Sequence, residues 1–436
     1  MPELKRALGL LETSFYGIGL ILGAGIYALI GKAAGISGNA VWISFIFAAF
    51  IATLTALSYC ELSAMFPKAG AEYVYVQKTF GRRWLSFLVG WLFLFTIVFG
   101  AAAVALGFGG YLSALLSPIV KIPAIIGASI LVIVMTAVNL YGIEQSSKLN
   151  IIFTALEAFG LIFIIALGIG HFGNVNYLEL PPGEGIGSIF VAAALIFFAY
   201  VGFEDIANIA EEVKKPEKTL PRAIVISVVV TTILYILVAI SAISILDWKT
   251  LGQSGAPLAD VAETALPGSS SLLGTIALFS TGNTVLILLI TISRMLYGMA
   301  REGALPRFFS KVGKRKTPWI SGIASMIIIL GLIMTGNIRS VAEVSNFTIL
   351  AVFISVNASL IYLRYSKPYL PRPFKVPLNI GRFPIIPSLG IAFSLFLMAN
   401  FSAKIILSGI GIILLGLVVY EISDFFEHKK FHVTHV

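Results

Sequence analysis

The chain has 436 residues, of which 58% are hydrophobic and only 12% are charged. Soluble domains carry about 25% charged residues, so this composition excludes a soluble enzyme, a nucleic-acid-binding protein or a disordered chain as a description of the whole. The excess of 30 Lys and Arg over 21 Asp and Glu, a net charge of +9, is therefore interpreted by its position along the chain, as in a membrane protein.

The beginning of the chain contains Glu3, Lys5 and Arg6, and the apolar stretch that follows is too long for the core of a signal peptide. No cleaved targeting segment is expected. Cys60 is the only cysteine in the sequence, which excludes a disulfide framework.

A helix needs about 20 mostly apolar residues to cross the hydrocarbon core of a bilayer. The sequence accordingly predicts an all-α integral membrane protein with twelve transmembrane helices, at 11–33, 41–66, 84–114, 121–141, 149–170, 187–212, 222–247, 272–298, 318–336, 341–363, 383–402 and 404–423. The longest connections, 248–271, 299–317 and 364–382, are too short for separate domains. Any functional site must therefore be built from the helices and these short connections.

The basic residues divide unevenly between the two sides of this topology. With the N-terminus in the cytoplasm, 24 of the 30 Lys and Arg residues lie on the cytoplasmic side. Lys32, Lys121, Lys249, Arg339 and Lys404 lie on the other side, and Arg294 lies within a span. This is the asymmetry of the positive-inside rule. The protein is therefore predicted to lie in the cell membrane with both termini in the cytoplasm.

The first span is rich in glycine. Gly17, Gly19, Gly23 and Gly25 fall within nine residues, and each glycine costs a helix roughly 1 kcal/mol relative to alanine. Close helix packing through small residues is one interpretation. An interruption of the helix near Gly23 is the other.

The sixth span favours the second interpretation. Gly202 is followed by Phe203, Glu204 and Asp205, and carboxylates at this depth require a cavity or a partner. Spans one and six each begin a set of five helices, and paired interruptions at corresponding positions are typical of transporters with inverted repeats. We therefore expect residues 1–170 to form one five-helix repeat, residues 171–363 a second, inverted repeat, and residues 364–436 two peripheral helices and a cytoplasmic tail.

Two breaks at the membrane midplane would free both backbone N–H groups and backbone carbonyls from their helical hydrogen bonds. The N–H groups near Gly23, Ala24 and Gly25 begin the second half of the first helix, and such a helix start favours a carboxylate. Carbonyls near Ile21, Phe198, Ala199 and Val201 are acceptors for an ammonium group. Together they predict a site for a zwitterion, with amino acids as the obvious ligands. The residues proposed to bind it are Ile21, Gly23, Ala24, Gly25, Ile26, Phe198, Ala199, Val201 and Gly202.

Several motifs occur together in a characteristic order. They are Gly23-Ala24-Gly25-Ile26, Tyr59-Cys60-Glu61-Leu62, Phe66-Pro67-Lys68-Ala69-Gly70-Ala71-Glu72-Tyr73-Val74-Tyr75, Tyr200-Val201-Gly202-Phe203-Glu204, Glu211-Glu212-Val213-Lys214-Lys215-Pro216-Glu217-Lys218, Leu220-Pro221-Arg222, and Ser293-Arg294 with Ala300-Arg301-Glu302-Gly303-Ala304-Leu305-Pro306. With these motifs the chain resembles the amino acid/polyamine/organocation superfamily, and most closely its archaeal ApcT-type proton-coupled amino acid transporters. The resemblance covers spans one to eight.

The resemblance implies a core of ten helices in two inverted sets of five. It implies that the substrate carboxylate meets the Gly23-Ala24-Gly25 break, that Phe198 occupies the position of an aromatic gate, and that Glu204 matches an acidic residue following the second break. The expected activity is secondary active transport of amino acids by alternating access, with proton symport and a broad preference for neutral amino acids. A sodium-coupled symporter, an amino acid exchanger and a membrane channel are the alternatives.

The fifth span departs from the family pattern. Many proton-coupled members carry a lysine there, and this sequence has Ala158 beside Glu157 instead. Either the natural protein couples through another group, or this chain is an engineered variant in which alanine replaced a lysine. A buried lysine can exchange a proton and alanine cannot. The candidate coupling and gating residues are Gly19, Glu61, Glu157, Ala158, Glu204, Ser280 and Thr281, the last two as oxygen ligands for sodium together with the carbonyls near Gly19.

The sequence gives little support for a metal site, an ATP-driven pump or an enzyme. His171 falls in an external loop, and His428, His432 and His435 fall in the polar tail, so no metal site is expected. The sequence has no Gly-rich loop followed by Lys and Ser or Thr, which disfavours an ATP-driven pump. We expect no enzymatic activity and no cofactor; the expected partners are the amino acid substrate, protons or less favourably sodium, and the lipid bilayer.

Overall fold

The computed structural model describes residues 6, 8–68, 70–141, 147–301, 305–313 and 317–433, with only the backbone described for Ala24, Tyr141, residues 147–152 and residues 424–433. Glu3, Lys5, Ala69, residues 302–304, residues 314–316 and His435, which the sequence analysis used, lie outside the described residues. The side chains of Lys148, His428 and His432 are likewise not described.

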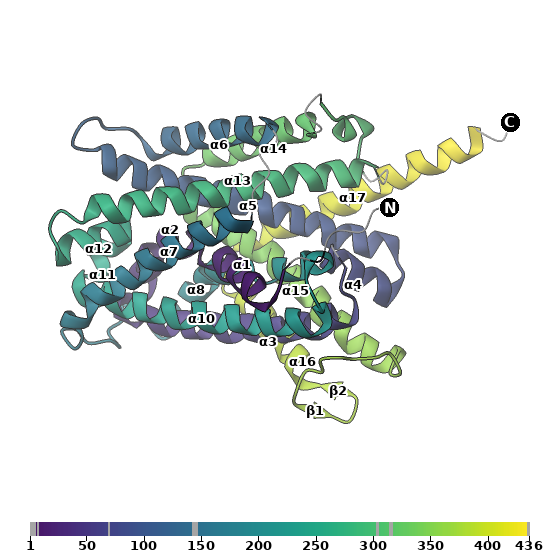
Figure 1. Cartoon of the computed structure of the whole chain (residues 1–436), viewed down its shortest axis with the longest axis horizontal. Coiled ribbons are helices and arrows are strands. Elements are labelled where there is room, and N and C mark those ends of the chain that lie inside the picture. Colours follow the sequence, from purple (N-terminus) through teal and green to yellow (C-terminus); the bar gives the residue numbers. More distant parts are fainter. Residues whose placement is uncertain are drawn as a thin grey trace.

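Long helices run side by side along one direction (Figure 1). The first part of the chain forms α1 (Leu10–Leu22), α2 (Ala24–Ser37), the 3-10 helix η1 (Gly38–Ala40), α3 (Val41–Met65), α4 (Ala71–Phe80), α5 (Arg83–Leu116), α6 (Ala124–Tyr141), α7 (Ser147–Gly168) and η2 (Ile169–His171). The centre of the bundle is built where α5 packs against α13 (Ser270–Arg301) and α15 (Ile338–Ser366), and where α10 (Pro216–Ile245) packs against α1 and α3.

The remaining elements begin with a short, interrupted helix and end with a long one. They are α8 (Gly187–Ile196), η3 (Phe197–Tyr200), α9 (Asp205–Asn208), η4 (Ala210–Glu212), α10 (Pro216–Ile245), α11 (Trp248–Gln253), α12 (Pro257–Ala265), α13 (Ser270–Arg301), η5 (Arg307–Ser310), α14 (Trp319–Ile333), α15 (Ile338–Ser366), β1 (Asn379–Ile380), β2 (Phe383–Pro384), α16 (Ile385–Ala399) and α17 (Ala403–Val433). The two strands pair as a small antiparallel hairpin.

Seven segments of the described chain are long and apolar enough to cross a membrane, by length and composition. They are Leu10–Met65, which contains α1, α2 and α3, and Arg83–Leu116, Gly187–Asn208, Pro216–Ile245, Ser270–Arg301, Ile338–Ser366 and Ala403–Ser423. Four shorter apolar helices cover Ala124–Leu140, Phe153–Ile169, Trp319–Ile333 and Ile385–Ala399. Apart from the hairpin, the described chain has the all-α architecture expected of an integral membrane protein.

Several element boundaries differ from the predicted spans. α10 begins at Pro216 rather than at 222, because proline fits the first turn of a helix, where an N–H group has no partner within the helix. α17 continues to Val433 rather than ending at 423. The connections also contain α4, α11, α12 and the hairpin, which the hydropathy pattern did not predict because short interfacial elements leave no membrane-length apolar signal.

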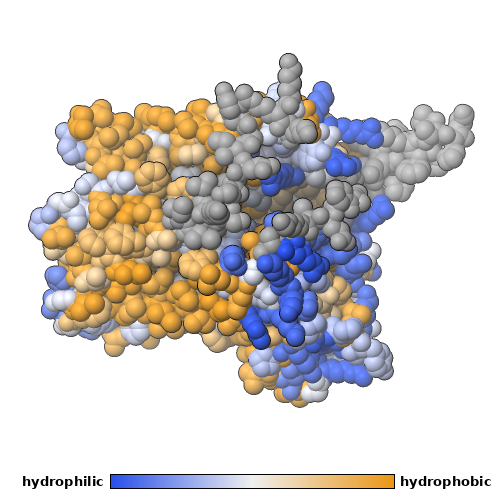
Figure 2. Space-filling model, in the orientation of Figure 1, coloured by the Kyte–Doolittle hydropathy of each residue, from blue (hydrophilic) through white to orange (hydrophobic). Residues whose placement is uncertain are grey.

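The surface separates into an apolar and a polar region. Figure 2 shows hydrophobic residues over the middle and left of this face and hydrophilic residues gathered toward the right, where α4 and the β1–β2 hairpin lie in Figure 1. Large apolar side chains on the helices are exposed, among them Ile130, Ile133, Val229 and Ile233. In water such a surface would be unfavourable, whereas hydrocarbon chains cover it without cost.

A buried ion cluster fastens the segment between α15 and β1 to the bundle. Glu61 on α3 is fully buried, and its carboxylate accepts from Arg364 Nη2 at 2.5 Å and from Arg372 Nε at 3.1 Å. The backbone N–H of Val376 donates to the same carboxylate at 2.8 Å. Glu61, which the sequence analysis proposed as a coupling or gating residue, thus joins α3, α15 and the loop that follows α15.

We expect Glu61→Gln to destabilise the protein by about 3 to 5 kcal/mol, because the change leaves two largely buried guanidinium groups without their counter-charge. Thermal unfolding in detergent measures the effect. Glu343→Gln is the matched control: Glu343 is also buried, with a side chain 8% exposed, but its partner Arg339 is 43% exposed, so water solvates the guanidinium that loses its counter-charge and we expect a loss of about 1 kcal/mol or less. Equal unfolding temperatures for the two variants would contradict the structural role of Glu61.

Candidate functional site

The first helix is interrupted in the middle of its apolar segment. α1 ends at Leu22 and α2 begins at Ala24, with Gly23 between them in a non-helical conformation. The Gly23 N–H still donates to the Gly19 carbonyl at 3.2 Å. No side chain caps α2, so the first N–H groups of this helix point to the break without a side-chain partner.

A second interruption lies between α8 and α9. The helix tightens to 3-10 geometry in η3, Val201 is extended, and Gly202 has a φ of +129°. This φ favours glycine because it places a Cβ against the backbone. The Gly202 N–H donates to Glu204 Oε2 at 2.9 Å, so Glu204 partners a backbone group that the break releases.

The two interruptions meet. A Cβ added to Gly25 would lie 2.6 Å from the Cα of Ala199, and a Cβ added to Gly202 would lie 3.0 Å from the carbonyl oxygen of Leu20. The glycines therefore allow backbone to contact backbone at both breaks. Thr284 of α13 faces the same place, with its hydroxyl 3.2 Å from the position of a Cβ on Gly23.

Tyr235 of α10 connects the breaks, and sequence reasoning missed it. Its buried hydroxyl lies 2.5 Å from the Ile21 carbonyl oxygen and 3.1 Å from the Ala199 carbonyl oxygen. Two of the carbonyls that the sequence analysis assigned to an ammonium group therefore already contact a donor. The one sequence feature that points to this bridging role is a tyrosine within an apolar span. Such tyrosines also occur where helices simply pack together.

A cavity of about 90 Å³ lies at the junction of the breaks, with room for several water molecules. Its lining includes nine of the predicted site residues: Gly19, Ile21, Gly23, Gly25, Glu157, Phe198, Val201, Gly202 and Glu204. Leu20 and Asp205 line it as well. The residues predicted from the two breaks are thus brought together from segments almost 180 positions apart in the sequence.

Three further helices complete the cavity. They contribute Phe93, Thr96, Ile97, Gly100 and Val104 from α5, Asn283, Thr284, Ile287, Leu288 and Thr291 from α13, and Ser345 from α15. The ring of Phe198 approaches α5 closely, with Cε2 3.8 Å from the position of a Cβ on Gly100. Sequence reasoning missed these positions, because in a helix that is apolar on all sides no pattern marks the face that lines a cavity.

Other predicted residues do not line this cavity. Ile26 and Ala199 are buried beside it, and the side chain of Ala24 lies outside the described residues. The Thr281 hydroxyl donates to the Ala277 carbonyl of its own helix at 2.6 Å, the usual use of a hydroxyl in a membrane helix. Glu61 lies in the ion cluster described above.

Ala158 lies on a helix that packs tightly against α1. A Cβ added to Gly19 would overlap the hydroxyl of Thr154, so this face of α7 touches α1 directly. Ala158 follows Thr154 by four residues and therefore shares its face, one turn further along α7. Position 158 thus faces α1 on the side of its break.

Glu157 is the carboxylate of α7 in the cavity wall. Its side chain is 3% exposed and lies beside Ser280 of α13. Its backbone carbonyl accepts from the Tyr27 hydroxyl at 2.8 Å, which ties α7 to α2. Glu157, Glu204 and Asp205 all line the cavity, yet the described residues contain no group of three or more His, Cys, Asp or Glu side chains able to hold a metal ion.

A polar network connects α9, which follows the second break, to α4. Glu72 of α4 accepts from the Tyr59 hydroxyl at 3.0 Å and from the Asn208 amide at 3.4 Å, and Asn208 Oδ1 accepts from the Ala71 N–H at 2.8 Å. Burial, together with the nearby Asp205 carboxylate and against hydrogen bonds that lower it, raises the pKa of Glu72 from 4.5 to about 7. Glu72 was quoted in the sequence analysis only as part of a motif.

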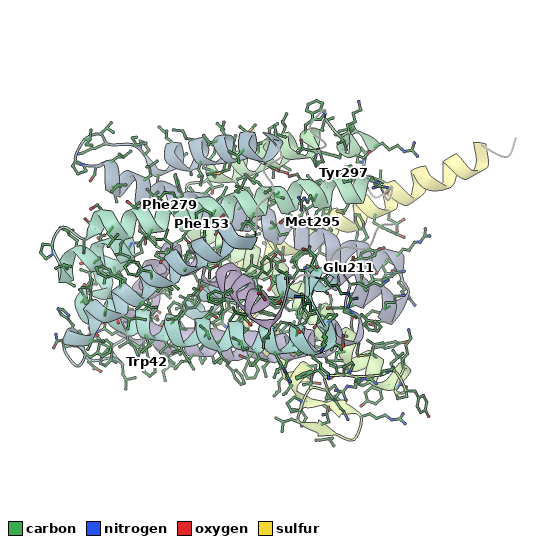
Figure 3. All side chains as sticks on the ribbon, viewed as in Figure 1. Trp42, Phe153, Glu211, Phe279, Met295 and Tyr297 are labelled. Carbon is green, nitrogen blue, oxygen red and sulfur yellow. The ribbon has the colours of Figure 1, made fainter. Side chains whose placement is uncertain are left out.

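A second, apolar groove of about 620 Å³ lies between α5, α6, α7 and α13. Phe153 of α7 and Phe279 of α13 belong to its lining and lie close together in Figure 3. Asn283 lines both this groove and the central cavity. The groove lacks the converging backbone groups of the two breaks, so the central cavity remains the candidate site.

The sequence is similar to those of known transporters. The model of a family described as "Amino acid permease" matches residues 8–420. The chain is 31% identical to the branched-chain amino acid permease BcaP of Bacillus subtilis and 29% identical to the methylthioribose transporter of the same organism, in each case over 96% of this chain and 93% of the relative. It is 28% identical to the vacuolar cationic amino acid transporter 4 of Arabidopsis thaliana, over 84% of this chain and 64% of that protein.

Gly25→Ala should force the two breaks apart, because the added methyl group meets backbone atoms of Ala199 that cannot rotate away. We expect a loss of about 1 to 3 kcal/mol in stability, the usual cost of overpacking, measured as thermal unfolding in detergent. Gly90→Ala is the control, since a Cβ there has no neighbour within 4 Å. An unfolding temperature of Gly25→Ala as high as that of Gly90→Ala would show that the breaks do not touch.

The raised pKa of Glu72 predicts a pH-dependent stability. The folded protein holds the Glu72 proton up to about pH 7, whereas the unfolded chain releases it near pH 4.5. The folded state binds more protons within this window, so stability falls as the pH rises through it, by at most on the order of 3 kcal/mol.

Glu72→Gln should remove this contribution and unfold at a more similar temperature at pH 5.5 and pH 8 than the unmodified protein does. Glu184→Gln, which changes an exposed carboxylate, should leave the original pH dependence intact. If all three proteins show the same dependence, Glu72 does not hold its proton in the folded state.

Proposed function

The chain belongs to the amino acid permease family, and on this premise we propose that it is a secondary active transporter that carries amino acids across the membrane by alternating access. Members of the family are transporters and not enzymes, and they act in the lipid bilayer. The observation that carries the proposal is the meeting of two helix breaks at one buried cavity. A helix start and a set of carbonyls converge there.

The proposed orientation of the substrate follows from these backbone groups. The carboxylate binds the N–H groups at the start of α2, near Gly23 and Gly25, where the helix dipole and the uncapped N–H groups favour an anion. The ammonium group binds acceptors near Phe198, Val201 and the carboxylates of the cavity. Tyr235 holds Ile21 and Ala199 in place beside the substrate instead of leaving their carbonyls fully open to it.

A preference for neutral amino acids is part of the proposal. The cavity wall opposite the breaks includes Ile97, Val104, Ile287 and Leu288, which suit an apolar side chain. A relative similar over nearly the whole chain carries the name branched-chain amino acid permease. Relatives named cationic amino acid transporters provide the contrasting substrate class for the test.

The proposed topology has twelve spans, with both termini in the cytoplasm of a cell whose plasma membrane holds the protein. Residues 1–170 and 171–363 form inverted repeats, and residues 364–436 form the peripheral part. The gathering of hydrophilic residues at one end of the face seen in Figure 2 supports this orientation, because basic connections favour the cytoplasmic side. The contact between the broken helices supports the pairing of the repeats.

We further propose proton coupling of the archaeal ApcT type, with residue 158 as the position that decides it. Position 158 faces α1 near its break, one turn from Thr154, where a lysine would place its ammonium group beside the substrate cavity. With Ala158 in this position, the remaining groups able to exchange a proton with the substrate site are the buried carboxyls Glu157, Glu204 and Asp205. Sodium coupling through Ser280 and Thr281 is the alternative for the same region.

Uptake of labelled leucine into proteoliposomes tests the transport activity. We expect saturable uptake, counterflow after preloading, and stronger competition by neutral amino acids than by lysine or arginine, because apolar residues line the side-chain end of the cavity. Flux that rises linearly with concentration and shows no counterflow would instead identify a channel.

The comparison of the present chain with Ala158→Lys under an inward proton gradient tests the coupling. We expect the lysine variant to gain at least about tenfold in gradient-driven uptake, which corresponds to about 1.4 kcal/mol, and the chain with Ala158 to respond weakly. Gly90→Ala serves as a control for a change elsewhere in the membrane. An equal response of both proteins to the gradient refutes a role for position 158.

A further inference from the structure

A groove far from the central cavity lies where the first turns of α10 meet the segment between α15 and β1. It encloses about 550 Å³. α10 contributes Glu217, Lys218, Pro221, Arg222, Val225 and Ile226, and the segment contributes Pro373 and Phe374. None of these residues lines the central cavity, and the proposed transport activity gives them no role.

One face of α10 carries both a basic end and an apolar extension. Lys218, Arg222, Ile226, Val229 and Ile233 are all exposed and recur every three or four residues, so they form a single stripe along the helix. Fifteen residue steps of about 1.5 Å make this stripe about 22 Å long, somewhat more than the roughly 15 Å depth of hydrocarbon in one leaflet. The stripe matches the length of one phospholipid from its headgroup to the end of its acyl chain.

The stripe also lies at the right depth. In Figure 2 the apolar surface that accompanies α10 gives way to hydrophilic residues toward the first turns of that helix. Basic side chains at such a boundary extend their charged ends into the headgroup region. Lys218 and Arg222 therefore stand at headgroup level, and Val225 and Ile226 stand at the level of the acyl chains.

The other wall of the groove is held rigidly. Arg372, two residues before Phe374, donates through its guanidinium to Glu61 and to the carbonyls of Leu363, Lys367, Pro368 and Leu370. Val376, two residues after Phe374, donates its N–H to Glu61. The buried ion cluster thus fixes the backbone on both sides of Phe374.

The basic groups of the groove have no charged partner in the described chain. The ion pairs among the described residues join Arg339 to Glu343, and Arg364 and Arg372 to Glu61, and none includes Lys218 or Arg222. Glu217 is the one carboxylate among the lining residues of the groove, and the two positive charges of Lys218 and Arg222 exceed its single negative charge. The groove therefore combines net positive charge at its polar end with an apolar floor.

We propose that this groove binds an anionic phospholipid of the adjacent leaflet. The lipid phosphate lies between the Lys218 ammonium and the Arg222 guanidinium, and one acyl chain runs down α10 over Val225 and Ile226, with Phe374 against its upper part. The bound lipid covers the outer face of the helix whose inner face carries Tyr235, the residue that joins the two breaks. It stabilises α10 in its present position.

Native mass spectrometry of the full-length protein in detergent, titrated with phosphatidylglycerol or phosphatidylcholine, tests the proposal. We expect one tightly bound phosphatidylglycerol and no comparable binding of phosphatidylcholine. The double variant Lys218→Gln with Arg222→Gln should bind phosphatidylglycerol at least about tenfold more weakly, because each basic residue near a membrane surface contributes to the attraction of an anionic headgroup. Phe374→Ala should weaken binding with both charges intact.

The matched control is Lys375→Gln with Arg382→Gln. It removes the same two charges from exposed positions of the segment and its hairpin, outside the groove, and should bind the lipid as the unmodified protein does. All four replaced side chains are exposed, so unfolding temperatures in detergent without added lipid should agree and exclude misfolding.

Two outcomes would overturn the proposal. Equal affinity for phosphatidylglycerol in both double variants would mean that net charge alone attracts the lipid. Displacement of the lipid by soluble glycerol phosphate at similar concentration would mean that the site binds a free phosphate and not a membrane lipid.

Discussion

Backbone groups released inside a membrane must be partnered by the protein or its ligand, because hydrocarbon offers no hydrogen bonds. This constraint organises the centre of the molecule. Gly23 and Gly202 interrupt two helices, and the interruptions are placed against each other so that Tyr235, Glu204 and the cavity share the released groups. In the proposed function, a substrate with both a carboxylate and an ammonium group would complete the set, which is the physical basis for proposing amino acids at this cavity.

The buried acids of the chain serve separate purposes. Glu61 is neutralised by two arginines and holds the α15 to β1 segment in place. Glu204 partners a backbone N–H at the second break, and Glu157 closes the cavity from α7. Glu72 connects α4 to α3 through Tyr59 and to α9 through Asn208. Because each carboxylate has its own partners, loss of one is expected to disturb stability, the break or the cavity, and not all three together.

Charged residues on the outer surface are also restricted in position. Arginine and lysine residues gather where helices end, and the ion cluster at Glu61 shapes one such end into the groove between α10 and Phe374. The inner face of α10 carries Tyr235 at the junction of the breaks, and the outer face carries the stripe that runs from Lys218 to Ile233. A single helix thereby connects the surface that lipid covers with the site where the breaks meet.

The amino-acid sequence by itself determined the class of protein, because a run of about 20 apolar residues has few uses other than crossing a membrane. It also located both breaks, since glycine and carboxylates at midplane oppose a continuous helix, and nine of the residues proposed for binding or coupling line the cavity. Only the tertiary structure decided which faces of α5, α13 and α15 complete the cavity, that Tyr235 bridges Ile21 and Ala199, and that Glu61 belongs to a distant ion cluster. The physical reason is that a helix which is apolar on every side carries no periodic signal of its orientation, so its partners are set by packing between segments far apart in the chain.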